Sequence, residues 1–165
     1  MNLIIGNHDY QPEYDAHQLL LSDSKKGKRL DLSGVCLKMA YLRDSCLRKA
    51  NLRGTDLTVA CLAGADLRVA NLCEAQMSVV NMEKADLRGA NLQGANLHKG
   101  IMNNSNLGDA DLRGVDLSGV GLLGANLIGA KLNGVCWKGT SIGSAKMSLS
   151  SRLLAFMGGA REYSY

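Results

Sequence analysis

The residues best suited to nucleophilic, acid–base or metal chemistry are five cysteines and three histidines, and they are scattered along the chain. They are Cys36, Cys46, Cys61, Cys73, Cys136, His8, His17 and His98. The cysteines form no CxxC pair, and the sequence has no GxSxG, P-loop or HExxH motif. A catalytic cluster needs a nucleophile, a base and an orienting group within reach of one another. The pattern therefore predicts no enzyme, no cofactor and no metal site.

The cysteines also give an indication of the cellular compartment. An odd and scattered set argues against a disulfide framework and favours a reducing compartment. The first ten residues lack the basic and apolar regions of a signal peptide, and no apolar run approaches the roughly 18 residues of a membrane span. The net charge of +4 over 165 residues is too weak to imply nucleic acid. We predict a cytoplasmic protein that binds neither nucleic acid nor membrane, with secretion as an effector left open.

A five-residue unit repeats twenty-four times between residues 30 and 149 without a break in register. The third residue of each unit, here called the central residue, is Leu in eighteen units and Met, Trp or Ile in the rest. The first residue is Ala thirteen times and Val five times, the second is mostly Asn, Asp or Cys, and the fifth is often Gly. A period of five fits neither the helical repeat of about 3.6 nor the strand repeat of 2.

Each unit offers two inward residues, one large and one small, and three outward ones. Burying one Leu contributes about 1.5 to 3 kcal/mol, whereas ordering each residue costs about 1 to 2 kcal/mol of backbone entropy. A single unit therefore cannot fold alone, and the units must stack into a solenoid with one continuous core. Gly at the fifth position suits a turn that needs a positive φ.

The stretch ADLRGANLQGANL, residues 85–97, resembles the pentapeptide-repeat family, whose unit is a small residue, Asp or Asn, Leu or Phe, a polar residue and any residue. The resemblance covers residues 30–149. It implies an all-β solenoid, a right-handed quadrilateral β-helix of about six coils with four units per coil and short helical caps at its ends. The chain departs from many members because it lacks Phe at every central position, where Trp137 is the one large ring.

The two ends fall outside the repeat register. We predict that residues 1–29 form an N-terminal cap or extension, with a targeting segment as the alternative. Residues 150–165 are predicted to form a capping helix and a tail, with Ser148 or Ser150 as the N-cap. The last coil of a solenoid needs its core covered. A set of apolar residues is expected to cap this end, or to cap it and also form the homodimer contact that the resemblance implies: Leu153, Leu154, Phe156 and Met157.

Two surfaces are candidate partner sites if residues 20 apart stack, as the resemblance implies. One is a basic column, Arg48, Arg68 and Arg88, which is either a stripe for an acidic partner or a surface neutralised by neighbouring Asp residues. The other is the least charged face, where grouped apolar side chains can mark a partner site. It includes Tyr41, Ile101 and Leu123, with Ile128 on the following side.

The predicted function is a non-enzymatic interaction or scaffold module whose partner is another protein. One alternative follows from the resemblance, because some family members protect bacterial gyrase, a type II topoisomerase, from quinolones by imitating duplex DNA. That mechanism needs a strongly acidic surface, whereas residues 30–149 carry 13 Lys plus Arg against 10 Asp plus Glu, a net charge of +3. A secreted bacterial effector is a further alternative, since similar repeat tracts occur in such proteins.

Overall fold

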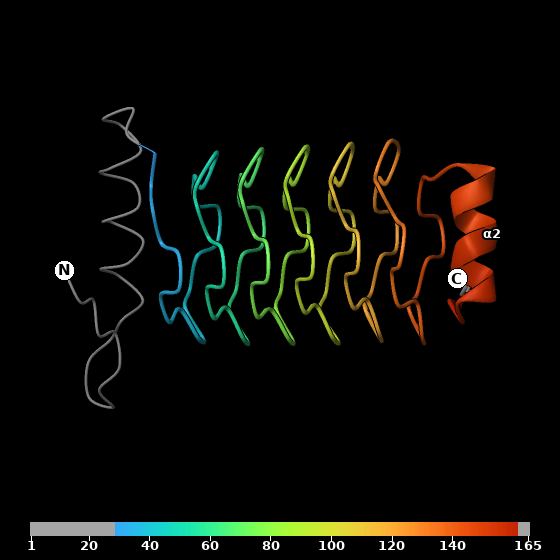
Figure 1. Ribbon diagram of the computed structural model, residues 1–165, viewed down its shortest axis with the longest axis horizontal. Helices are drawn as coiled ribbons and strands as arrows, with labels where there is room; N and C mark the ends of the chain where they lie inside the picture. Colours follow the sequence, from blue (N-terminus) through green and yellow to red (C-terminus); the bar gives the residue numbers. More distant parts are fainter. Residues whose placement is uncertain (1–28, 162–165) are drawn as a thin grey trace.

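The chain winds into a rod of stacked coils with an α-helix at its C-terminal end (Figure 1). The structure is a computed structural model and describes residues 29–161. Parallel bridges join residues 20 apart along the whole rod, from Asp31–Asn51 to Ser141–Arg161. This spacing confirms the stacking of every fourth unit that the sequence analysis expected. The predicted cap at residues 1–29 lies, except for its last residue, outside the described part.

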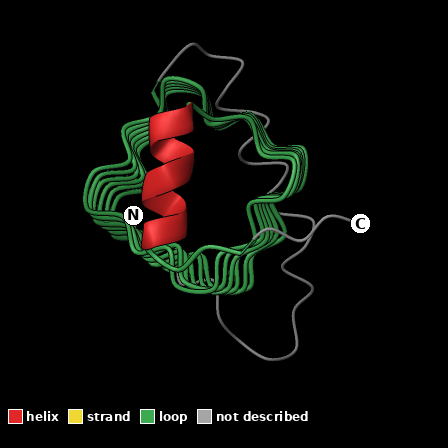
Figure 2. Cartoon of the chain, turned by 90° about the vertical axis from the view of Figure 1, so that its right-hand side faces the viewer, coloured by secondary structure: helices red, strands yellow, loops and turns green. Residues whose placement is uncertain are grey.

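Each coil has four sides, and each side is one five-residue unit (Figure 2). We call them side A, which begins with unit 30–34, side B with 35–39, side C with 40–44 and side D with 45–49, each recurring every 20 residues. Only the second residue of a unit forms a β-bridge. A turn follows every central residue except Met147, which leads into the C-terminal helix, so no side within residues 29–161 is long enough for a continuous strand.

The core is a stack of central side chains, each packed with the small first residues of the units. Leu62, Leu87 and Leu107 illustrate it, because each exposes at most 1% of its surface. Trp137 fills the core near the last coil with 3% exposed. Leu32 and Met147 are only half-buried, since each lies in a terminal unit of the repeat.

Backbone hydrogen bonds tie each side to the coils on both of its faces. On side C, the Cys61 N–H donates to the Ala40 carbonyl (2.9 Å) and the Leu62 N–H donates to the Asn81 carbonyl (2.6 Å). The chain then turns, and the Ala65 N–H donates to the Leu62 carbonyl (3.0 Å). Along the sides of the rod, the polar groups that would otherwise attract another strand are thus already paired.

Asp and Asn at the second position have a structural role. Their side-chain oxygen accepts the backbone N–H two residues later, as Asp56 does from Thr58 (2.9 Å). On side A the amides also join successive coils, because Asn71 donates to Asn51 (3.1 Å) and Asn51 donates to Asp31 (2.9 Å). The recurring Asp and Asn residues therefore stabilise both the turn and the stack.

Helix α2, Leu149–Met157, lies across the C-terminal end of the rod (Figure 2). Ser148 is its N-cap, since the Ser148 hydroxyl accepts the Ser151 N–H (3.1 Å), and Gly158 ends it. The chain then rejoins the stack, where the Arg161 N–H donates to the Thr140 carbonyl (2.7 Å). The part of the chain that the structure describes contains no helix long and apolar enough to span a bilayer.

The packing of α2 differs from the expectation that its large apolar residues cover the core. Ala155 is its buried residue, and the small Ala allows the helix to lie close to the last coil. The expected set points outward, with exposed fractions between 41% and 79%: Leu153, Leu154, Phe156 and Met157. The core of the last coil is therefore covered by the backbone of α2 and by small residues such as Ala155, not by these four side chains.

Candidate functional site

The residues with the most reactive side chains are not gathered in one place. Cys36, Cys46 and Cys136 are exposed, Cys61 and Cys73 are half-buried, and all five are free thiols. Four of them occupy the outward second position of their units, so they do not fill the core. Within residues 29–161, no group of His, Cys, Asp and Glu side chains could hold a metal ion.

Exposed apolar side chains gather at the corner between sides B and C. Seven large apolar residues are exposed on the coils of the described chain: Met39, Tyr41, Val59, Val69, Val79, Ile101 and Ile128. Five of these lie on this corner, in the fifth position of side B or the second position of side C. We define the apolar ridge as these five with half-buried Cys61 beside them: Met39, Tyr41, Val59, Cys61, Val79 and Ile101.

Two valines of the ridge have an unfavourable backbone conformation. Val59 and Val79 have φ values of 61° and 59°, a region in which a β-branched residue is a genuine outlier. Left-handed conformations cost an L-residue about 1 to 2 kcal/mol. Since the two side chains are 47% and 50% exposed, burial offsets this cost only in part. Val69 on side D shares this conformation, so what distinguishes Val59 and Val79 is their place among other exposed apolar side chains.

Side C also departs from the structural use of Asp and Asn. The second position is Asp or Asn in five of six units on side A, but only in one of six, Asn81, on side C. Ile101 has no side-chain oxygen to accept the backbone N–H two residues later. The Tyr41 hydroxyl is not placed to accept its corresponding N–H. In the fifth coil the second position is Gly121, which has no side chain, and the Leu123 N–H donates to the Asn103 side chain in the preceding coil (3.0 Å). The ridge therefore lies where two scaffold rules fail together.

The structure brings together only part of the apolar face predicted from the sequence. Tyr41 and Ile101 both lie on the ridge, with 46% and 44% of their surfaces exposed. Leu123 is half-buried further along side C, and Ile128 is exposed on side D, away from the ridge. Sequence reasoning missed Met39, Val59 and Val79 because it treated the fifth position only as a turn. Their signal was three apolar residues 20 apart at a position that favours Gly.

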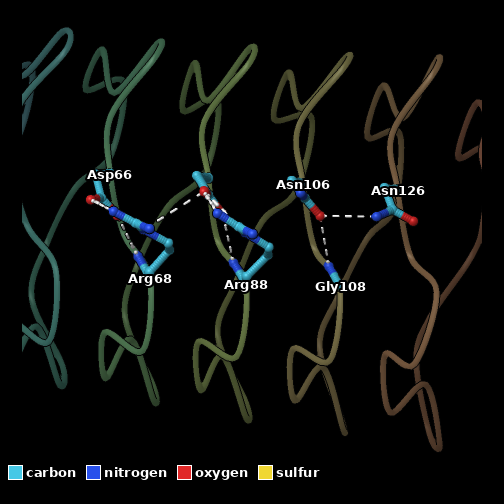
Figure 3. Close-up of polar contacts among 7 residues, drawn as sticks. Asp66, Arg68, Arg88, Asn106, Gly108 and Asn126 are labelled. Carbon is cyan, nitrogen blue, oxygen red and sulfur yellow. Dashed lines mark hydrogen bonds and ion pairs between the residues drawn. The ribbon is translucent and has the colours of Figure 1, made fainter.

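The basic column on side D is engaged with neighbouring carboxylates (Figure 3). Arg68 binds Asp66 through two hydrogen bonds of 2.6 and 2.8 Å, and lies 3.7 Å from Asp86. Arg88 in turn binds Asp86 (2.7 Å). Hydrogen bonds from these arginines lower the pKa of the Asp66 and Asp86 carboxyls. Arg48 has no ion pair among the described residues, so most of the column's charge is locally balanced.

Several solved structures of repeat proteins resemble the chain. HetL, a pentapeptide-repeat protein involved in heterocyst differentiation regulation from the cyanobacterium Nostoc sp. strain PCC 7120, is 25% identical; the match covers 79% of this chain and 71% of HetL, with a TM-score of 0.42. Rfr23 from the cyanobacterium Cyanothece 51142 is 35% identical over 69% of this chain and 65% of its own, with a TM-score of 0.26. The plasmid-mediated fluoroquinolone resistance protein QnrB1 is 16% identical over 81% and 85%, with a TM-score of 0.49.

The comparison with curated proteins gave no match. A family model described as pentapeptide repeats matches the chain in eight copies, at residues 28–62, 36–72, 50–89, 60–98 and 102–134. These ranges cover more than half of the chain and coincide with the stacked coils. The chain therefore belongs to the pentapeptide-repeat family, whose members fold as right-handed β-helices.

Proposed function

We propose that this protein is a non-enzymatic interaction module that binds a partner protein through the apolar ridge. The observation that carries the proposal is the pair Val59 and Val79, whose side chains are half-exposed although their backbone conformation is unfavourable for valine. Gly occupies the same turn position in many other units, as at Gly54 and Gly119, and polar residues such as Lys49 and Asp109 occupy it in others. A valine here improves neither the turn nor the core, but it does enlarge an exposed apolar surface.

The rod supports such a role through its rigidity. Backbone hydrogen bonds hold consecutive coils together on all four sides, so the ridge side chains are mounted on a fixed frame. A preorganised surface loses little conformational entropy on binding, and more of the contact energy then appears as affinity. Grouped exposed apolar residues on an otherwise polar surface are typical of protein interaction sites.

The charge distribution supports this role over imitation of DNA. Duplex DNA carries one negative charge per about 1.7 Å of its axis, whereas residues 30–149 have a net charge of +3. Several of the carboxylates are also neutralised, since Asp66 pairs with Arg68 and Asp111 pairs with both Arg113 and Lys131. A gyrase supercoiling assay with a quinolone separates the two roles, and rescue of gyrase by micromolar protein would favour DNA imitation.

The test of the ridge uses the double variant Val59→Gly and Val79→Gly, which removes apolar surface and relieves the backbone. Affinity capture from the source cells should recover a partner with the wild type and lose it with the double variant. The matched control is Val69→Gly on side D, because Val69 has the same conformation, with φ of 59° and 55% exposure, on a different corner. Equal partner recovery by all three proteins would refute the ridge as the binding surface.

We further propose that α2 is a contact surface through which two copies pair end to end. Five of its nine residues are large, apolar and exposed, and Leu149 and Met157 expose 88% and 79% of their surfaces. Phe156→Asp should convert a dimer to a monomer in sedimentation at micromolar concentration. A wild-type protein that sediments as a monomer at all accessible concentrations would remove this proposal and leave the ridge proposal intact.

A further inference from the structure

We infer that the occupant of the apolar ridge is an amphipathic α-helix of the partner that lies along the rod axis and carries acidic residues at both ends of its apolar stripe. The inference rests on the proposed function, and it adds the shape and charge of the partner. Three independent features of the ridge support it: the state of the backbone, the spacing of the side chains and the charges at its two ends.

The backbone beneath the ridge cannot pair with an extended peptide. Around Cys61, the N–H groups of Cys61 and Leu62 donate to Ala40 and Asn81 in the coils on either side, at 2.9 and 2.6 Å. Strand addition gains its affinity from main-chain hydrogen bonds to an open sheet edge, and the middle of side C has no such edge. A helix satisfies its own backbone groups, so it can bind through side chains alone.

The spacing of the ridge side chains also matches a helix better than a strand. Met39, Val59 and Val79 come from successive coils, which lie about 4.8 Å apart. A helix presents one side chain per turn of about 5.4 Å, whereas a strand repeats the same face every 6.7 Å or so. Over the three steps from the first coil to Ile101 in the fourth, a helix drifts by about 2 Å and a strand by about 6 Å. The ridge thus spans about ten helical residues, or three turns.

Positive charge lies at both ends of the ridge. Lys38 precedes Met39 in the first coil, and Lys99 occupies the ridge corner in the fourth coil, directly after Val79 in the column. Both side chains are exposed and neither forms a salt bridge within residues 29–161, although Lys38 lies near enough to Asp56 to help lower the pKa of that carboxyl. Along the nearby face, Glu83 is half-buried and Asp44 already pairs with Arg43 (3.4 Å). A helix with carboxylates near both ends complements this arrangement.

The charges also argue against α2 of a second copy as the occupant. Helix α2 is apolar and of suitable length, but its one charged residue is Arg152. It carries no carboxylate, so it offers nothing to complement Lys38 and Lys99. The ridge and α2 are therefore complementary to different partners, and the acidic helix remains the occupant that fits.

Binding of three fluorescein-labelled, 14-residue peptides to the full chain, followed by fluorescence anisotropy, tests the inference. The first peptide is stapled as a helix, with Leu at one position per turn and Glu at both ends. The second is the same stapled helix with Lys in place of Glu. The third is unstapled and alternates Leu with polar residues, with the same Glu content. We expect the first to bind about tenfold more tightly than the second, because its carboxylates pair with Lys38 and Lys99 where the Lys helix would repel them. We expect a similar preference over the third peptide, because only the helix matches the spacing of the ridge.

Variants of the protein separate the ridge from the shape and charge of its occupant. Val59→Gly with Val79→Gly should weaken binding of the first peptide about tenfold, since it removes two apolar contacts, and Val69→Gly should leave it unchanged. Lys38→Glu with Lys99→Glu should reverse the preference between the Glu and Lys helices. A preference that stays the same in this charge-reversed protein would overturn the acidic part of the inference.

Other outcomes distinguish a failure of this inference from a failure of the proposed function. If the alternating peptide binds as well as the Glu helix, or if none of the peptides binds, the helical occupant is wrong. The ridge proposal nevertheless stands when the double valine variant still loses the partner captured from cells. If the double variant loses neither peptide nor partner, both the helix and the ridge are refuted.

Discussion

Two neighbouring corners of the rod have the same core and different surfaces. At the corner between sides A and B, the fifth position is Gly in five of six coils, as the backbone prefers. At the corner between sides B and C, the same position is Met39, Val59, Val79 and Lys99 before Gly returns at Gly119. The second position is Asp, Asn or Gln in four of six units on side B, and Cys in the other two. On side C it is Tyr41, Cys61, Asn81 and Ile101 in the first four coils.

The difference shows that the pentapeptide pattern constrains the outer positions of the rod as well as its core. A positive φ favours Gly at the fifth position, and an unsatisfied N–H favours Asp or Asn at the second position. Where both preferences are followed, the stability of the turn is enough to explain which residues occupy these two positions. At the ridge the fifth position departs from Gly in four consecutive coils, and the second position departs from Asp or Asn in three of the same four, with Asn81 as the exception. The two preferences therefore do not account for the exposed apolar residues there.

The largest expected effect tests whether the two sides share one core. Leu57→Ala on side B and Leu62→Ala on side C remove equivalent, fully buried side chains in the same coil. Each should lower the free energy of unfolding by about 2 to 5 kcal/mol, as burial is lost and a cavity is left. Urea denaturation measures both values. A cost at Leu62 far below that at Leu57 would mean that the two sides differ in their interior too.

An exchange at the fifth position should have a smaller effect with opposite signs. Gly54→Val puts a branched side chain at a φ of 62° where no atom lies within 4 Å, so only the backbone opposes it. We expect a loss of about 1 to 2 kcal/mol. Val59→Gly should change stability by less than about 1 kcal/mol, because relief of strain offsets lost contacts and glycine entropy. Thermal unfolding of both variants checks this, and a costly Val59→Gly would show that Val59 stabilises the turn.

The second position allows a matching exchange in the fourth coil. Asn96 accepts the His98 N–H (3.1 Å) on side B, whereas Ile101 on side C is 44% exposed. Asn96→Ile should cost about 1 kcal/mol because that hydrogen bond is lost. Ile101→Asn should be neutral or slightly stabilising, since it supplies the missing acceptor. If chemical denaturation shows Ile101→Asn to be as costly as Asn96→Ile, side C relies on its apolar residue for stability.

Acid should have the smallest effect, and three of the carboxyls through which it acts form ion pairs on sides D and A. Hydrogen bonds from Arg68, Arg88 and Arg113 lower the pKa values of Asp66, Asp86 and Asp111 on sides D and A. Their stabilising contribution is present above the unfolded Asp pKa of about 3.9 and is lost as the pH falls below it.

Thermal midpoints measured between pH 5 and pH 2 should therefore fall with decreasing pH. Replacing Asp66, Asp86 and Asp111 by Asn should flatten this dependence. An unchanged slope in the triple variant would show that these carboxylates do not account for the acid sensitivity.

The sequence predicted the repeat and the inward columns, because one residue type recurs at each inward position without interruption. The 20-residue coil followed from the resemblance to the pentapeptide-repeat family, and the bridge spacing confirms it. It also predicted Tyr41 and Ile101 as outward apolar residues. It did not predict the ridge, because the fifth position tolerates many residues in a turn, and only the structure shows that Val59 and Val79 remain exposed. The outward direction of Phe156 was missed for a related reason: a short apolar helix can face its large residues either way, and small Ala155 allows the closer approach.

Because bridges join residues 20 apart, the face on which a side chain lies depends on how many five-residue units precede it. Removing one whole coil would shorten the rod by about 4.8 Å and leave every downstream side chain on its original face. Removing one five-residue unit would instead rotate everything downstream by a quarter turn. Deletion of residues 65–69, for example, would carry Val79 and Ile101 to a different face from Met39 and divide the apolar ridge in two. A rod of this kind can therefore gain or lose whole coils without rearranging its faces. A partner that contacts several coils would not tolerate the gain or loss of a single unit between them.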